Sequence, residues 1–191
     1  MTGSRDASHF DRLYQANPDP WHFRTNPYEQ AKYRHTCDVL QGRRFASALE
    51  VGCSIGVLTR MLAPQCDRLL ALDLVDQPLA AAARHCADQP WVEFQRMQVP
   101  EAWPERRFDL IVLSEVLYFL TPSDIDRCVR RIADSLLPGA AVLLVNWLGQ
   151  TDDPCSGDQA ADRFIAGSTE TLAITRQERR PRYRLDLLAA A

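Results

Sequence analysis

One segment of the chain combines an acidic residue with small residues at a spacing suited to ligand binding. The sequence Glu50-Val-Gly52-Cys-Ser54-Ile-Gly56 lies where a short apolar run gives way to a stretch with helical periodicity. Gly52 permits a tight turn, and the small Ser54 and Gly56 let the backbone approach a ligand closely. The carboxylate of Glu50 can pair with an ammonium group, which a phosphate site would have no reason to attract. The segment therefore predicts a binding turn between a strand and a helix.

The spacing of these residues argues against a dinucleotide site. A dinucleotide fingerprint needs G-x-G-x-x-G, whereas Ser54 and Val57 occupy the second and third glycine positions counted from Gly52. Asp73 ends the next apolar run, where its carboxylate can accept hydrogen bonds from both hydroxyls of a ribose. The alternative for Asp73 is a loop or helix-capping carboxylate. Together the two motifs predict a ligand that contains an amino acid and a nucleoside but no phosphates.

Alternating strand and helix patterns must position these motifs. Apolar runs and helical stretches follow one another through the middle of the chain, which indicates βαβ units and an open, doubly wound, mostly parallel sheet. Near the amino end, two helical patterns are separated by a proline-containing loop. The expected strands cover residues 46–51, 68–73, 91–95, 108–113 and 140–147, followed by a hairpin at 172–188, and the expected helices cover 57–63, 78–87, 123–136 and 159–166.

A second group of polar residues follows the expected fourth strand. Ser114, Glu115 and Tyr118 come directly after the run Phe108-Asp-Leu-Ile-Val-Leu113. In a doubly wound sheet, the carboxyl ends of the strands form the ligand face. These three residues are therefore candidates for the acceptor side of a site, and the alternative for Tyr118 is a packing role.

Composition excludes several function classes. The 191 residues carry a net charge of -3, which offers no large positive field for nucleic acid. No apolar run approaches the length of a membrane span. Six cysteines lack the spacing of metal ligands, so no metal is expected and the thiols are predicted to be reduced. With no export signal visible, we expect a cytoplasmic protein without nucleic-acid or membrane partners.

The Glu50–Gly56 motif, Asp73 and the Phe108 run together resemble class I S-adenosylmethionine-dependent methyltransferases. A closer resemblance is to the nodulation protein S group, and it covers roughly residues 10 to 150. The segments that carry it are Asp19-Pro-Trp21, Asn26-Pro-Tyr-Glu29, Leu49-Glu-Val-Gly-Cys53, Leu62-Ala-Pro64 and Glu115-Val-Leu-Tyr118.

This resemblance implies a Rossmann-like methyltransferase fold of seven strands in the order 3-2-1-4-5-7-6, with strand 7 antiparallel. It implies one methyltransferase domain over residues 1–191, with a helical lid at 1–42 and a sheet core at 43–191. Trp21 and Lys32 of the lid would meet the methionine end of S-adenosylmethionine, Lys32 by pairing with its carboxylate. The alternatives are a packing anchor for Trp21 and a solvated helix face for Lys32.

Two departures from the wider class are visible. Ser54 replaces a usual glycine, and the stretch Gln95-Arg-Met97-Gln98 lacks the usual acid that contacts adenine. Gln98 is the replacement candidate for that contact. The expected cofactor-binding set is therefore Trp21, Lys32, Glu50, Gly52, Ser54, Gly56, Asp73, Gln98 and Ser114.

The expected function is methyl transfer from S-adenosylmethionine to a small-molecule acceptor. The resemblance points to the amine of an amino sugar, with Glu115 as a candidate general base and Tyr118 beside it. The alternative is a catalytically impaired S-adenosylmethionine-binding protein or partner subunit. An NAD-dependent dehydrogenase fails on glycine spacing. Nucleobase methylation is disfavoured because Ser-Glu-Val-Leu follows the fourth strand, where such enzymes carry an Asn/Asp-Pro-Pro-Tyr/Phe sequence.

Overall fold

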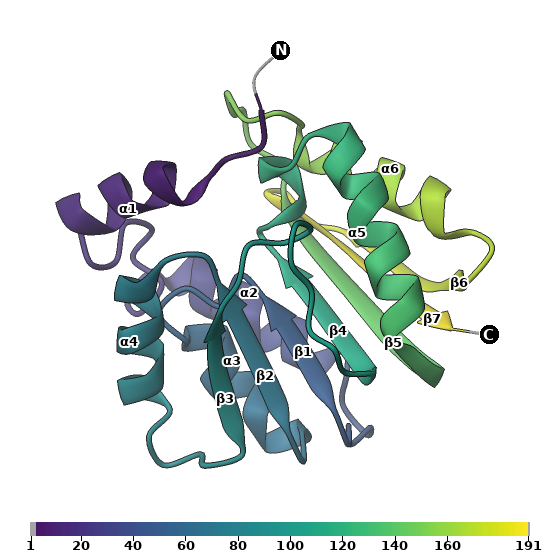
Figure 1. Ribbon diagram of the computed structural model, residues 1–191, viewed down its shortest axis with the longest axis horizontal. Coiled ribbons are helices and arrows are strands. Elements are labelled where there is room, and N and C mark those ends of the chain that lie inside the picture. The colour runs from purple at the N-terminus through teal and green to yellow at the C-terminus, as the bar shows by residue number, and fades with distance from the viewer. Residues whose placement is uncertain (1–2, 191) are drawn as a thin grey trace. The chain divides into compact units, whose positions relative to one another are not determined.

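The computed structural model describes residues 3–190. The chain divides into two compact units, one made of residues 6–97 and the other of residues up to 5 together with those from 98 onward. Each unit contains its own set of hydrogen-bonded strands with helices beside them (Figure 1).

The unit of residues 6–97 contains three parallel strands. β1 pairs with β2, and β2 pairs with β3, in a continuous parallel register. β1 and β2 are buried along their whole length, including the acids Glu50 and Asp73, whereas β3 is largely exposed. The elements are α1 (Ala7–Ala16), α2 (Pro27–Asp38), β1 (Ala48–Val51), α3 (Val57–Leu62), η1 (Ala63–Gln65), β2 (Leu69–Asp73), α4 (Asp76–His85) and β3 (Val92–Arg96).

The loop between α1 and α2 follows from its prolines and caps. The Asn17 backbone ends α1 with extended geometry. The Asn26 side chain accepts a hydrogen bond from the Tyr28 amide, and Pro27 occupies the first turn of α2, where its missing N–H costs nothing. The two amino-terminal helices expected from the sequence are confirmed.

The second unit contains four strands. β4 pairs with β5 in parallel, and β7 runs antiparallel to both β5 and β6. The strand order of the chain is β3-β2-β1-β4-β5-β7-β6, so the expected doubly wound, mostly parallel seven-stranded fold is confirmed. The elements are β4 (Phe108–Ser114), η2 (Leu117–Phe119), α5 (Pro122–Ser135), β5 (Leu136–Trp147), α6 (Gly157–Ser168), β6 (Leu172–Arg179) and β7 (Tyr183–Ala190).

β5 is longer than its apolar run indicates. It begins at Leu136, which pairs with Phe108, rather than at residue 140, and the register shifts between Phe108 and Leu110. Gly139 adopts a φ of +69° within this irregular start. The sequence signal failed here because a bulge accommodates Pro138 and Gly139, which normally interrupt a strand.

The cysteine thiols lie inside the protein. All six cysteines are free and buried, and burial raises the pKa of the Cys37 thiol to about 12, so it stays a thiol at neutral pH.

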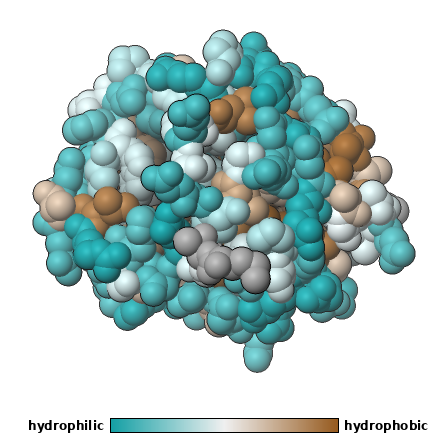
Figure 2. Space-filling view, turned by 90° about the horizontal axis from the view of Figure 1, so that it is seen from above, coloured by the Kyte–Doolittle hydropathy of each residue, from teal (hydrophilic) through white to brown (hydrophobic). Residues whose placement is uncertain are grey.

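The face drawn in Figure 2 is mainly hydrophilic, with small separate hydrophobic patches. Within residues 3–190, no helix is long and apolar enough to cross a membrane, and no three His, Cys, Asp or Glu side chains gather to hold a metal.

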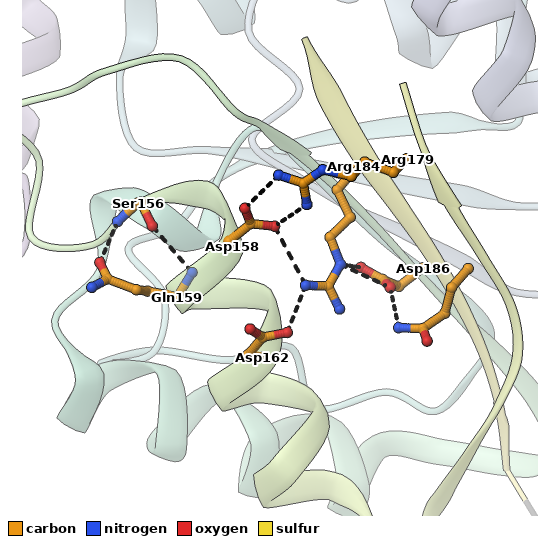
Figure 3. Close-up of polar contacts among 8 residues, drawn as sticks. Ser156, Asp158, Gln159, Asp162, Arg179, Arg184 and Asp186 are labelled. Carbon is orange, nitrogen blue, oxygen red and sulfur yellow. Dashed lines mark hydrogen bonds and ion pairs between the residues drawn. The ribbon is translucent and has the colours of Figure 1, made fainter. Parts of the chain in front are cut away.

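An ion-pair network joins α6 to the β6–β7 hairpin (Figure 3). Asp186 on β7 is fully buried, and its carboxylate accepts hydrogen bonds from Arg184 Nε and from Gln177 Nε2. The Arg184 guanidinium also pairs with Asp162 on α6, while Arg179 makes two 2.8 Å bonds to Asp158. Arg184 thus compensates a carboxylate that water cannot reach.

The network predicts unequal costs for two substitutions. Arg184→Met should lower the free energy of unfolding by about 3–5 kcal/mol, because it leaves the buried Asp186 carboxylate without its cation. Asp162→Asn is the matched control, since the Asp162 side chain is 68% exposed, and it should cost no more than about 1 kcal/mol. Urea unfolding of both variants measures the difference, and equal losses would refute this role of Arg184.

Candidate functional site

The turn after β1 has an unusual backbone. Gly52, Ser54 and Gly56 have φ values of +80°, +48° and +80°. A Cβ on Gly56 would stand 2.8 Å from the Cβ of Ala82 on α4, so only glycine lets α3 begin there. Ser54 has a side chain and still adopts the left-handed region, which is a strained conformation that structures keep mainly at functional sites.

Asp73 holds this turn in place. Its carboxylate accepts a 2.9 Å hydrogen bond from the Ser54 amide and a 3.1 Å hydrogen bond from the Val75 amide, one on each oxygen. The side chain is buried, and burial raises the pKa of Asp73 to about 6 although these hydrogen bonds lower it. Asp73 thus holds the turn and can also accept hydrogen bonds from a ligand, because each carboxylate oxygen can receive a further hydrogen bond.

Glu50 is the second buried acid of the turn. It is 1% exposed, and its Oε2 has no hydrogen-bond partner among residues 3–190. Burial is the main reason that the pKa of Glu50 rises to about 7, and the negative charge of Asp73 adds to it. A buried carboxylate oxygen without a partner is costly. The ammonium of S-adenosylmethionine would satisfy it, so the residues present fit this cofactor.

The structure adds Tyr14, which the sequence analysis missed. Its hydroxyl lies 2.5 Å from Ser54 Oγ, and its carbonyl accepts a hydrogen bond from Gln77 Nε2. Burial raises the pKa of Tyr14 far above its ordinary value, so the phenol stays neutral. Phe10 and Tyr14 are buried on one face of α1 at an i,i+4 spacing, a pattern that could have indicated a packed face but not the partner.

Trp21 belongs to an aromatic cluster around Tyr14. Its ring lies edge-on to Tyr14 at 5.8 Å between centroids and stacks on Phe23 at 5.4 Å. Trp21 is half-buried. The cluster therefore connects the loop between α1 and α2 to the residue that contacts Ser54.

Lys32 is buried rather than solvated. It is 2% exposed, its Nζ pairs with Glu29 Oε2 at 2.8 Å, and the Tyr28 and Tyr33 rings lie 5.3 and 5.6 Å away. The alternative of a solvated helix face is wrong, because cation–π contacts and an ion pair compensate the buried charge. Pairing of Lys32 with a cofactor carboxylate stays a prediction.

In the second unit, Glu115 is the centre of a polar group. Its Oε2 accepts a 2.8 Å hydrogen bond from the Tyr118 hydroxyl and a 3.0 Å bond from the Trp147 amide. Glu115 has a φ of +60°, held by its own amide, which donates to the Val145 carbonyl at 2.8 Å. This is a second strained residue at the end of a strand, and its carboxylate has a fixed orientation.

Two further polar side chains are buried at these strand ends. Ser114 Oγ and both side-chain polar atoms of Asn146 have no hydrogen-bond partner within residues 3–190. Sequence reasoning named Ser114 but missed Asn146 and Trp147, which end an apolar run that reads as core. Gln98 lies exposed after β3, and its contact with adenine stays a prediction.

The structure thus brings together two sets of expected residues. In the unit of residues 6–97, the turn of Glu50, Gly52, Ser54 and Gly56 meets Asp73, with Tyr14 added. In the other unit, Glu115 and Tyr118 are directly bonded. The first set suits a ligand with an ammonium and a ribose, and the second suits a proton-accepting role.

Comparisons with known proteins point the same way. The family model described as "Nodulation protein S (NodS)" matches residues 7–145. Nodulation protein S of Bradyrhizobium diazoefficiens is 32% identical over 159 residues, which are 81% of this chain and 75% of that protein. That of Rhizobium tropici is 34% identical over 127 residues, which are 65% of this chain and 53% of that protein.

Solved structures share the fold. The N-methyltransferase NodS from Bradyrhizobium japonicum WM9, in complex with S-adenosyl-L-homocysteine, has a TM-score of 0.82 and 22% identity, covering 96% of this chain and 97% of that one. The DhpI–SAH complex has a TM-score of 0.77 and 18% identity, covering 97% and 95%. These likenesses confirm the Rossmann-like methyltransferase fold.

The raised pKa of Glu50 predicts how the ligand-free protein responds to pH. The folded state holds this proton up to about pH 7, whereas the unfolded chain releases it near 4.5. Raising the pH through this window therefore lowers the free energy of unfolding, by about 3 kcal/mol once the folded state has also lost the proton. Glu50→Gln should remove this loss, so the variant gains stability relative to the parent between pH 5 and pH 8.

Urea unfolding at the two pH values, without ligand, measures this difference. Glu93→Gln, at an exposed position on β3, is the control and should follow the parent. If Glu50→Gln also follows the parent, the buried charge assigned to Glu50 is incorrect.

Proposed function

The chain belongs to the nodulation protein S family of S-adenosylmethionine-dependent methyltransferases, and from that premise we propose that it methylates the amine nitrogen of a small acceptor such as an amino sugar. The observation that carries the proposal is the Glu115 carboxylate, held by Tyr118 and by the Trp147 amide. The related NodS of known structure is named an N-methyltransferase. N-methyl transfer needs a free lone pair on nitrogen, and a fixed carboxylate can provide it by accepting a proton from the amine.

Each candidate residue then has a role toward the cofactor. Glu50 pairs with the ammonium, Asp73 accepts from the ribose hydroxyls, and the turn at Gly52, Ser54 and Gly56 lets the backbone approach. The remaining candidates are Trp21 and Lys32 toward the methionine end, Gln98 toward adenine, Ser114 as a further hydroxyl contact, and Tyr14 beside Ser54.

The chemistry asks little of the protein beyond positioning. Bound S-adenosylmethionine supplies a methyl group on a sulfonium. The acceptor nitrogen uses its lone pair to form a bond to the methyl carbon. The bond between that carbon and sulfur breaks at the same time, and the electron pair of the broken bond remains on sulfur. Glu115 accepts the proton that the amine loses, and Tyr118 holds the carboxylate in the orientation that this requires.

The alternative of a catalytically impaired binding protein has less support. A chain without catalysis would have no need to keep Glu115 in a strained backbone with two hydrogen bonds to one oxygen.

We also propose that residues 1–42 act as a lid on a sheet core at 43–191 within one methyltransferase domain. The cytoplasmic location stays a prediction.

An acceptor screen with S-adenosylmethionine labelled in its methyl group tests the proposal. Glucosamine and its short β-1,4 oligomers should take up label, whereas N-acetylglucosamine and glucose should not, because they lack a free amine. Glu115→Gln should lower kcat by about 100-fold or more while S-adenosylhomocysteine affinity stays unchanged. Label found only on hydroxyl compounds would contradict N-methylation, and binding without any transfer would favour the impaired alternative.

The lid proposal predicts an effect of Trp21→Ala on binding. If Trp21 closes over the cofactor, its removal should weaken affinity for S-adenosylmethionine, which carries the sulfonium cation, by about tenfold and change the melting temperature of the free protein little. Trp91→Ala, at a position 37% exposed, is the matched control and should leave affinity unchanged. If Trp21→Ala lowers the melting temperature strongly but binds normally, then Trp21 is a packing anchor.

A further inference from the structure

Trp147 ends β5 and has a fixed relation to Glu115. Its amide donates to Glu115 Oε2 at 3.0 Å, so the tryptophan and the candidate base are joined through one hydrogen bond. The Tyr118 hydroxyl donates to the same oxygen. Trp147 also stands at the carboxyl end of a parallel strand, the edge at which doubly wound folds bind ligands.

Two glycines make room for Trp147. A Cβ on Gly149 would lie 1.9 Å from Cζ2 of the indole and 2.3 Å from Cη2, so the ring rests directly on the backbone of residue 149. A Cβ on Gly157, the first residue of α6, would lie 1.9 Å from the Trp147 carbonyl oxygen. Side chains at either position would displace Trp147.

This support is not explained by core packing. Trp147 is only half-buried, whereas the strand residues before it from Ala140 to Asn146 are buried. An aromatic ring that is fixed on one side by glycine backbone and exposed in part provides a rigid surface for a ligand. A flexible side chain at the same place would have to be ordered each time a ligand bound.

We propose that Trp147 is an acceptor-binding residue that supports the apolar face of the acceptor while Glu115 receives its amine. This inference rests on the proposed function. A ring bearing C–H groups on one face and an amine at its edge suits a fixed indole on the residue whose backbone amide holds the Glu115 carboxylate. An amine that arrives protonated is also attracted to the aromatic face. Small amines without an apolar face would lack the first contact.

Kinetics of four variants test the proposal, with a glucosamine tetramer as the acceptor. Trp147→Leu should raise KM for the tetramer at least tenfold, with kcat within a few-fold of the parent. Trp147→Phe keeps an aromatic ring and should raise KM less. Gly149→Ala should also raise KM, because the new Cβ displaces the indole. Gly167→Ala is the matched control, since its Cβ would meet only ordinary contacts at 3.6 Å or more.

Affinity for S-adenosylhomocysteine provides the second readout. It should stay unchanged in all four variants, because Trp147 is assigned to the acceptor alone. An unchanged KM in Trp147→Leu, or a parallel loss of S-adenosylhomocysteine affinity, would overturn the proposal.

Direct titration separates this proposal from the proposed function. The tetramer is titrated into the parent protein and into Trp147→Leu, each saturated with S-adenosylhomocysteine, so that no methyl transfer is required. Weaker binding to the variant supports the role of Trp147 even if the parent transfers no methyl group. Equal binding to both proteins, or no binding to the parent, contradicts it.

Discussion

The carboxylate of Asp73 is the constraint on which the candidate cofactor site depends. It lies buried at the end of β2 and accepts the Ser54 and Val75 amides, one on each oxygen. Without these bonds, Ser54 would have no reason to adopt a φ of +48°. That conformation in turn places Ser54 Oγ against the Tyr14 hydroxyl. A single acid thus connects the second strand, the turn after the first strand and the amino-terminal helix.

The same burial explains the electrostatics of the site. Glu50 and Asp73 are two acids in one small region, and their pKa values rise to about 7 and about 6. Such an arrangement is unfavourable for the ligand-free fold when both are ionised. A ligand with a positive charge and hydroxyl donors would compensate it, so the instability of the free site and the chemistry of its cofactor have one cause.

Much of this could be predicted from sequence, because the relevant signals are local. Glu50, Gly56 and Asp73 each stand where a strand ends or a helix begins, and periodicity locates those points. Tyr14 could not be predicted, since its partner Ser54 is 40 residues away and belongs to another element. Lys32 was placed on its helix, but its burial beside Glu29 depends on tertiary packing. Trp147 was missed for the same reason, because its bond to Glu115 spans 32 residues.

The central claim is that the buried Glu50 carboxylate receives the ammonium of the cofactor, and proton release on binding tests it most directly. S-adenosylhomocysteine is titrated calorimetrically at pH 6.5 in two buffers that differ in ionisation enthalpy. Because Glu50 is largely protonated in the free protein at this pH, we expect release of roughly half a proton or more per ligand bound. Glu50→Gln should lose most of that release. Heats that do not depend on the buffer, or equal release in the variant, would contradict the account.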